Sequence, residues 1–270
     1  MKTILKWTAC AACAVWTGAS ASAATETVTG QNVIGLTTIE NDSRAYLPLA
    51  AAYTGTGATE LTVANVVQTA TLAEGDELYA YDYDPERKQY DVYTLGTDGK
   101  WTVVKTVEVS ASGKATETTS PAAADRVITR GRGFWIVRKD AASDAKPVRL
   151  VGDVPATAAT VTIPAAVDGK PSATLIGVPS DWKLNETDWT DKAAKGDTIR
   201  VLNEDGEAWH EIRYDGTKWI EYRQEMDATK TITVTTSDAP VLKGGYAVWY
   251  MRAGTDSFTL TLPFTLTLPR

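Results

Sequence analysis

The chain has 270 residues, of which 34 are acidic and 27 basic, so its formal net charge is −7. This balance argues against nucleic acid and anionic membranes as partners, because both carry negative charge themselves. The length is sufficient for two lobes of roughly 100 residues, each large enough to bury a hydrophobic core.

Residues 1–23 have the features of a secretory signal peptide. Lys2 and Lys6 precede a short, alanine-rich apolar run, and Ala21-Ser22-Ala23 matches the small-residue cleavage pattern. The run is shorter than the roughly 20 residues that a membrane-spanning helix needs. We therefore expect an exported protein that begins near Ala24, has no membrane span after cleavage, and carries a net charge of −9, since the signal contains two lysines and no acid.

Both cysteines, Cys10 and Cys13, lie inside this signal segment. A lipoprotein anchor is the alternative interpretation, but the residues before each cysteine lack the Leu or Val usual at the start of a lipobox. Cleavage would leave a protein without cysteine, so we expect no disulfide framework.

A long pattern in the first half of the chain returns, shortened, in the second half. The stretch Gly75–Arg138 corresponds to Gly196–Arg252. The matching positions are Gly75 with Gly196, Trp101 with Trp219, Gly131 with Gly245, Trp135 with Trp249, and Arg138 with Arg252. We therefore predict a tandem duplication of two related lobes, at residues 24–168 and 169–270.

The start of each copy is marked by a short match. Ile34-Gly35 resembles Ile176-Gly177. In the first copy a Thr/Ala/Gly-rich passage follows from Tyr46 to Thr71, whereas the second copy has a shorter segment that contains Trp182 and Trp189. The two copies are expected to differ most here.

The next segments predict a meander of at least three antiparallel strands in each copy. Leu78 and Ala80 alternate with Tyr79 and Tyr81, which is the period-two pattern of a half-buried strand. Further on, Asp98-Gly99 and its counterpart Asp215-Gly216 predict tight primed hairpin turns with positive φ angles.

A glycine-bounded strand closes each unit. Residues 134–137 (Phe-Trp-Ile-Val) and 248–251 (Val-Trp-Tyr-Met) are apolar on both faces, which predicts central strands buried on two sides. We expect Trp135 and Trp249, like Trp101 and Trp219, to be core residues.

Two strand-like segments near the lobe ends resemble each other. Thr160–Pro164 is similar to Phe258–Pro263, and we assign it as the closing strand of the first lobe. The hexapeptide Phe-Thr-Leu-Thr-Leu-Pro then occurs a second time, at Phe264–Pro269. One of the two copies is a spare strand, which suits β-augmentation or self-association.

His210 is the only histidine, and any His-based catalytic site would have to use it. It lies on a predicted strand beside Trp209, and Asp91 takes its place in the first copy. Nucleophile-elbow, zinc-protease and phosphate-loop motifs are absent from the sequence, and Gly131-Arg-Gly133 precedes a strand instead of a helix. We predict no catalytic residue, no cofactor and no enzyme activity.

Acidic clusters fall in predicted turns. They comprise Asp82, Asp84 and Glu86 in the first copy and Glu204, Asp205 and Glu207 in the second. Solvated turn residues are the favoured interpretation, and we predict no metal site. A weak calcium site at Asp82 and Asp84, or a glycosidase carboxylate pair, are the alternatives.

Trp182 and Trp189 have no partner in the first copy and lie in a polar segment. If exposed, they would stack on a sugar or anchor a partner protein, so they are the candidate ligand-binding residues. The competing interpretation is that they cap the core of the second lobe.

The order of these motifs resembles modules of uncharacterised, exported, β-rich bacterial proteins. The resemblance covers most of the mature chain and rests on Ile34-Gly35, Gly75-Asp76, Trp101, Gly131–Arg138 (Gly-x-Gly-Phe-Trp-Ile-x-Arg) and Val148–Gly152. The second copy departs from this pattern at Gly245–Trp249. The resemblance implies location and fold type, and it brings no activity.

Together these patterns predict an all-β protein of two tandem lobes, each an antiparallel barrel or sandwich. The expected function is non-enzymatic binding or a structural role in the periplasm, at the cell surface or outside the cell. The ligand is unknown, with a glycan or a surface protein as candidates. The alternatives are a carbohydrate-binding module or glycan-active enzyme, and a surface assembly subunit that uses its C-terminal strand.

Overall fold

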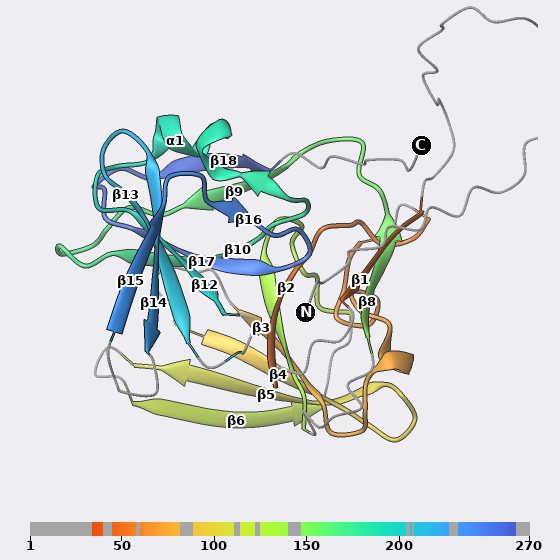
Figure 1. Ribbon diagram of the computed structural model, residues 1–270. Coiled ribbons are helices and arrows are strands. Elements are labelled where there is room, and N and C mark those ends of the chain that lie inside the picture. Colours follow the sequence, from red (N-terminus) through yellow and green to blue (C-terminus); the bar gives the residue numbers. More distant parts are fainter. Residues whose placement is uncertain are drawn as a thin grey trace, which may run out of the picture.

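The protein is all-β and is built on two six-stranded antiparallel sheets, as a computed structural model shows (Figure 1). The structure describes residues 34–39, 45–57, 60–81, 89–110, 114–121, 125–139, 147–203, 206, 208–226 and 232–262. In spatial order the first sheet comprises β2 (Tyr46–Ala50), β7 (Gly133–Val137), β3 (Glu77–Tyr81), β4 (Gln89–Leu95), β5 (Trp101–Val109) and β6 (Ala115–Pro121). The second comprises β10 (Ser172–Gly177), β17 (Ala247–Arg252), β12 (Thr198–Leu202), β13 (Trp209–Tyr214), β14 (Trp219–Met226) and β15 (Ile232–Ser237).

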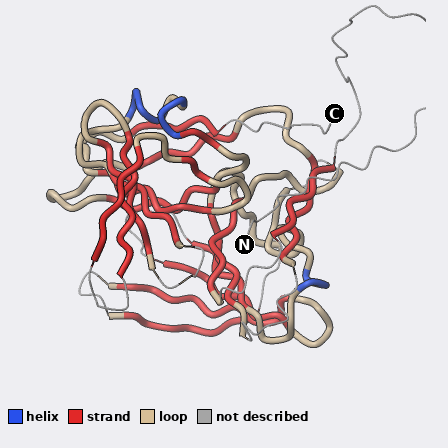
Figure 2. The backbone as a smooth tube through the Cα atoms, in the orientation of Figure 1, coloured by secondary structure: helices blue, strands red, loops and turns tan. Residues whose placement is uncertain are grey.

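Three two-stranded sheets complete the fold. They pair β1 (Ile34–Ile39) with β8 (Val148–Asp153), β9 (Ala159–Ile163) with β18 (Phe258–Leu262), and β11 (Trp182–Lys183) with β16 (Val241–Leu242). Helix is confined to the single turn α1 (Trp189–Lys192) and the 3-10 turns η1 (Thr69–Thr71) and η2 (Leu184–Glu186) within the described ranges (Figure 2). None of these helices is long or apolar enough to cross a membrane, as far as the described chain goes.

The two halves of the chain share one strand order. Each six-stranded sheet begins with an early strand, continues with the glycine-bounded strand, and then adds the meander. In each half the strand before the sheet pairs antiparallel with the strand after it, as β1 with β8 and β9 with β18. Both large sheets are open among the described residues, so the lobes are layered and not closed barrels.

Each large sheet buries one face in its own core. The first core joins Leu47, Leu78 and Ile136 of the sheet to Leu150 of β8. The second joins Ile199 and Tyr250 to Leu260 of β18, and it also encloses Trp219. Because neighbouring residues of a strand point to opposite faces, the sequence alternation at positions 78–81 is confirmed: Leu78 and Ala80 are buried, while Tyr79 and Tyr81 are only partly buried.

The strand pairing corrects two expectations. Ile34-Gly35 lies in β1, whereas Ile176-Gly177 ends β10, whose place in the first sheet is taken by β2, so the two dipeptides do not mark equivalent points. The segment at residues 160–164 does not close the first lobe, because β9 pairs with β18. Sheet membership alone would divide the chain between β8 and β9, earlier than residue 168.

The predicted hairpins are confirmed, but their turns are not of the primed type that was expected. Gly99 and Gly216 have positive φ angles, but Asp98 and Asp215 do not. Among the described residues Asp168 is the only non-glycine residue with a positive φ angle. Asp215 instead accepts hydrogen bonds from the backbone of Thr217 (2.7 Å) and Lys218 (2.9 Å). A turn with both central φ angles positive occurs at Asp168-Gly169, which joins β9 to β10.

Candidate functional site

A buried acid–arginine pair explains the repeated Gly-Asp and Arg of the second copy. Asp197 is fully buried at the start of β12, and its Oδ2 lies 2.6 Å from Arg252 Nη1 at the end of β17. Tyr250 donates its hydroxyl to the same oxygen (2.6 Å), and Ala253 N–H donates to Oδ1 (2.8 Å). Burial, and then the hydrogen bond to Asp197, raises the pKa of Tyr250. These groups satisfy one another's hydrogen bonds, so the cluster fixes the turn before β12 to the end of β17.

The first half has matching backbone hydrogen bonds around Asp76. Its carboxylate accepts hydrogen bonds from the backbone N–H groups of Ala73 (2.9 Å) and Lys139 (3.0 Å), and both Asp76 and Arg138 are buried. Ile136 stands where the second copy has Tyr250. The sequence contained the signal for this cluster, because acid and arginine recur together, but they are too far apart in the chain for local pattern reasoning to pair them.

His210 lies at the end of the core face of the second sheet, in a polar cluster. Its Nδ1 is 2.8 Å from Asn203 Oδ1, and its Nε2 is 3.0 Å from Glu221 Oε1. Arg223 donates to the same Glu221 oxygen from Nε (2.9 Å). The hydrogen bond from His210 lowers the pKa of Glu221, with burial opposing it and Arg223 assisting. Both ring nitrogens are therefore engaged by neighbouring side chains.

In the first copy Asp91 takes the place of His210, as the sequence match predicts. Thr106 donates its hydroxyl to Asp91 (2.7 Å), and Arg126 forms an ion pair with it. Arg126 also lines an open cavity of about 240 Å³ together with Tyr81 and Arg132. This volume is below the roughly 300 Å³ at which drug-sized ligand sites begin.

Trp182 and Trp189, the candidate ligand-binding residues, are buried in the second core. Their exposed fractions are 6% and 1%, and their ring centroids lie 5.6 Å apart in an edge-to-face contact. Trp182 forms part of β11 and pairs with Leu242 of β16. In the first half, residues 61–63 pair in a similar way with residues 126–128. Neither indole presents a face on which a sugar could stack, so the arrangement matches the competing core-capping interpretation.

Several sequence candidates lie outside the described residues. They are the signal segment 1–23, the acidic residues Asp82, Asp84, Glu86, Glu204, Asp205 and Glu207, and the second hexapeptide Phe264–Pro269. Over the part of the chain that the structure does describe, no group of three or more His, Cys, Asp or Glu residues is placed to hold a metal ion.

The junction between the two halves is made by reciprocal backbone hydrogen bonds. Ala50 at the end of β2 donates its N–H to the carbonyl of Gly245, just before β17 (3.0 Å). Gly177 at the end of β10 donates in the same way to Gly131, just before β7 (2.9 Å). Because each half gives and receives the equivalent bond, the contact is isologous, like the interface of a two-fold dimer.

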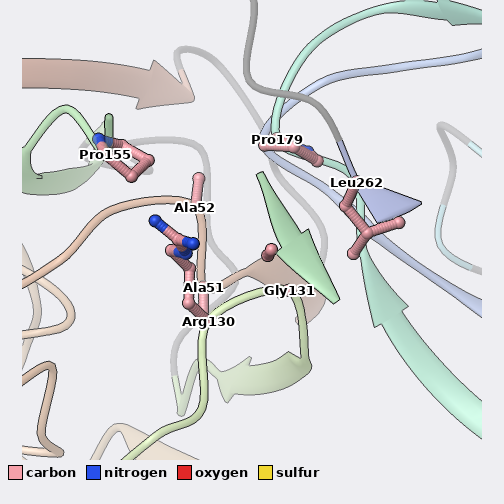
Figure 3. Close-up of a pocket in the computed structure, with 8 residues that line it drawn as sticks. Ala51, Ala52, Arg130, Gly131, Pro155, Pro179 and Leu262 are labelled. Atoms are coloured by element: carbon pink, nitrogen blue, oxygen red, sulfur yellow. The ribbon is translucent and has the colours of Figure 1, made fainter. Parts of the chain in front are cut away.

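Close side-chain packing surrounds these bonds. A Cβ at Gly133 would lie 2.5 Å from the Cβ of Ala247 and 2.6 Å from Leu175 Cγ, so only glycine fits there. Figure 3 shows the adjoining seam, where Ala51 and Gly131 lie opposite Pro179 and Leu262. The cavity in this seam has a volume of about 10 Å³, at the lower limit for a single water molecule.

Trp135 and Trp249 also belong to the junction. They occupy equivalent positions in β7 and β17, but both are half-buried and contact the other half of the protein. Trp135 meets Trp209 edge-to-face at 5.9 Å, and Trp249 meets Tyr81 at 5.2 Å. The expectation that they are core residues of their own lobes was therefore wrong, whereas Trp101 and Trp219 are core residues as predicted.

The outer edges of the two six-stranded sheets are unpaired among the described strands. β6 and β15 end their sheets at equivalent positions, and no described strand pairs with their outer sides (Figure 1). Both strands are rich in threonine and their described side chains are almost all exposed. β15 contains no charged residue, and Val234 in its centre is 53% exposed. Free edges of this kind pair readily with other strands.

Comparisons with protein-family models, with curated proteins and with solved structures found no match to this chain. The chemistry of the site therefore has to be judged from its geometry alone. Two features stand out in that geometry: a junction that joins the halves tightly, and two open sheet edges.

Proposed function

We propose that this is an exported, non-enzymatic binding or structural protein that presents two exposed edge strands to other molecules. The observation that carries the proposal is the equivalent, open position of β6 and β15 at the ends of the two sheets. An edge strand offers a row of backbone donors and acceptors, and extended segments bind such edges by strand addition.

The same proposal includes a tandem origin for the two lobes. The shared strand order, the reciprocal junction and the paired Asp76–Arg138 and Asp197–Arg252 positions all support it. Duplication of a unit with one free edge gives a protein with two, held at a fixed spacing. The resemblance to exported bacterial modules is consistent with this and remains a prediction.

Export is tested by expressing the full chain in a host that can process it and sequencing the recovered N-terminus. We expect it to begin at Ala24, in the periplasm, at the cell surface or in the medium. Recovery of Met1 on a cytoplasmic protein would contradict the proposal of export.

Binding is tested by co-sedimentation of the processed protein with isolated cell envelopes. The variant that carries both Thr118→Lys and Val234→Lys places a charge on each exposed edge and should lose retention, because edge lysines block strand addition. His210→Ala is the matched control and should be retained like the wild type. Retention that depends on His210 and not on the edges, or hydrolysis of envelope material, would contradict the proposal.

The glycan-binding alternative loses the support of Trp182 and Trp189, which are buried, while the turn carboxylates that it also used lie outside the described residues. The assembly alternative keeps its support, because a free edge and a spare strand-like segment occur in the same chain.

A further inference from the structure

The C-terminal segment Phe264–Leu268 repeats the sequence of β18 residue for residue. β18 shows how this sequence pairs: it runs antiparallel to β9, with Leu260 opposite Val161 and with Thr259 and Thr261 opposite Thr162 and Thr160. Leu260 and Val161 lie side by side in this pairing and are both buried in the second core. In this structure the sequence Phe-Thr-Leu-Thr-Leu therefore pairs with a strand that is centred on Thr-Val-Thr.

The tripeptide Thr-Val-Thr recurs at the free edge of the second sheet, as Thr233-Val234-Thr235 of β15. In β9 the valine is part of the second core and 1% exposed, whereas Val234, on the free edge, is 53% exposed. The other edge, β6, offers Thr-Glu-Thr in its centre, so a leucine there would face the carboxylate of Glu117. Charge opposite an apolar residue disfavours pairing, and this distinguishes the two edges.

From this match we infer that Phe264–Leu268 of one chain adds as a strand to the edge of β15 in a second copy of the protein, with Leu266 opposite Val234. The inference rests on the proposed edge-binding function and names its partner. In this register Leu266 lies directly opposite Val234 as Leu260 lies opposite Val161, and Thr265 and Thr267 lie opposite Thr235 and Thr233.

The donor and the acceptor belong to different molecules because the link is too short within one chain. Leu262 lies at the lobe junction, where its Cδ1 would be 2.8 Å from a Cβ placed on Gly131. Gly131 accepts a hydrogen bond from Gly177 at the end of β10, and β15 is the fifth strand beyond β10 in the second sheet, about 24 Å away at the usual spacing of about 4.8 Å between strands. Pro263 alone separates Leu262 from Phe264, and one residue spans about 3.5 Å.

Pairing of this kind is heterologous, since the C-terminus of one chain meets the β15 edge of the next. Such contacts generate open chains unless the rotation between subunits closes a ring. The processed protein should therefore show a mean mass that rises with concentration in sedimentation velocity.

The acceptor is tested with Val234→Lys, and the matched control is Thr118→Lys on β6. We expect Val234→Lys, and likewise deletion of residues 264–270, to weaken association by about tenfold or more. Thr118→Lys should leave it unchanged. Both substituted side chains are exposed, and unchanged circular dichroism and thermal midpoints show that the variants fold.

A charge pair then tests the register. Leu266→Glu alone should also abolish association, and combining it with Val234→Lys should restore association, because opposite charges directly across a strand pair attract. Combining Leu266→Glu with Val234→Glu should not restore it. Rescue by the first combination alone supports the register.

Association that survives Val234→Lys, or a wild type that stays monomeric at all concentrations, would overturn the inference. A different route to association is replacement of β18 on β9 of one chain by residues 264–269 of another. That route does not use β15, so it predicts association that survives Val234→Lys, and the experiment separates the two routes. Envelope retention is measured independently, so the proposed function stands or fails separately from self-association.

Discussion

Asp197 is the centre of a buried polar cluster in the second lobe. Its carboxylate joins Arg252, the Tyr250 hydroxyl and the backbone of Ala253 in a site closed to solvent. Removing one member of a buried pair leaves the other charge without compensation, which typically costs about 3–5 kcal/mol.

We therefore expect Asp197→Ala to lower the free energy of unfolding by about 3–5 kcal/mol in urea titrations. Asp76→Ala should act in the same direction in the first lobe. Asp215→Ala is the control, because Asp215 lies in an exposed turn and should change stability much less. An Asp215→Ala loss as large as that of Asp197→Ala would contradict the role given to the buried pair.

Glu221 makes the stability of the second lobe depend on pH. Its pKa in the folded protein lies below the ordinary value of 4.5, chiefly through the hydrogen bond from His210. A lowered folded pKa stabilises the protein above the unfolded value, and this contribution is lost as the pH falls through the folded pKa.

The wild type should consequently be more stable than Glu221→Gln at pH 7, and the two should converge as the pH falls below 4.5. Urea midpoints at several pH values measure the difference. A gap that stays constant or widens in acid would show that Glu221 does not act through its charge.

At the scale of elements, the close approach of β7 and β17 depends on one small residue on each side. Gly133 and Ala247 occupy equivalent positions and face each other across the junction. An added methyl group at Gly133 has no room, and overpacking of this kind typically costs about 1–3 kcal/mol.

Gly133→Ala should thus be destabilising by about 1–3 kcal/mol in urea titrations. Combining it with Ala247→Gly returns the missing space and should recover part of the loss, although Leu175 remains close. If the double variant is no more stable than the sum of the two single changes predicts, the two residues are not coupled in the way the structure indicates.

The sequence was sufficient to predict the meanders and the central glycine-bounded strands, because alternation and turn residues are local signals. Residues 89–95 and 101–109, for example, pair as a hairpin around Gly99. It was not sufficient to predict the pairing of β9 with β18, since that contact joins residues nearly 100 positions apart. Similarity between those two strands suggested equivalence, whereas they are partners.

The faces of Trp135 and Trp249 show the same limit. Periodicity indicates that both faces of their strands are apolar, but it does not reveal what covers each face. One face is covered by the lobe's own core, and the other by aromatic residues of the opposite half. For Trp182 and Trp189 the polar sequence context left both exposure and core capping open, and the segment folds so that both indoles are buried in the core.

At the scale of the whole molecule, the reciprocal junction turns two lobes into one body with edges at fixed positions. A linker-joined pair would leave β6 and β15 free to move relative to each other. Here backbone hydrogen bonds, tight glycine packing and two aromatic contacts connect the halves directly. Fixed edges suit a protein that binds or assembles by strand addition, because less orientational freedom is lost on binding.

Hydrogen exchange at the two amides that cross the junction, Ala50 and Gly177, tests this account most directly. Each donates to a carbonyl of the other half, so both should exchange as slowly as the core amides of β7 and β17, by global opening only. Fast exchange at Ala50 and Gly177, while the core amides of both sheets stay protected, would show that the lobes separate readily and would contradict the rigid two-lobed body.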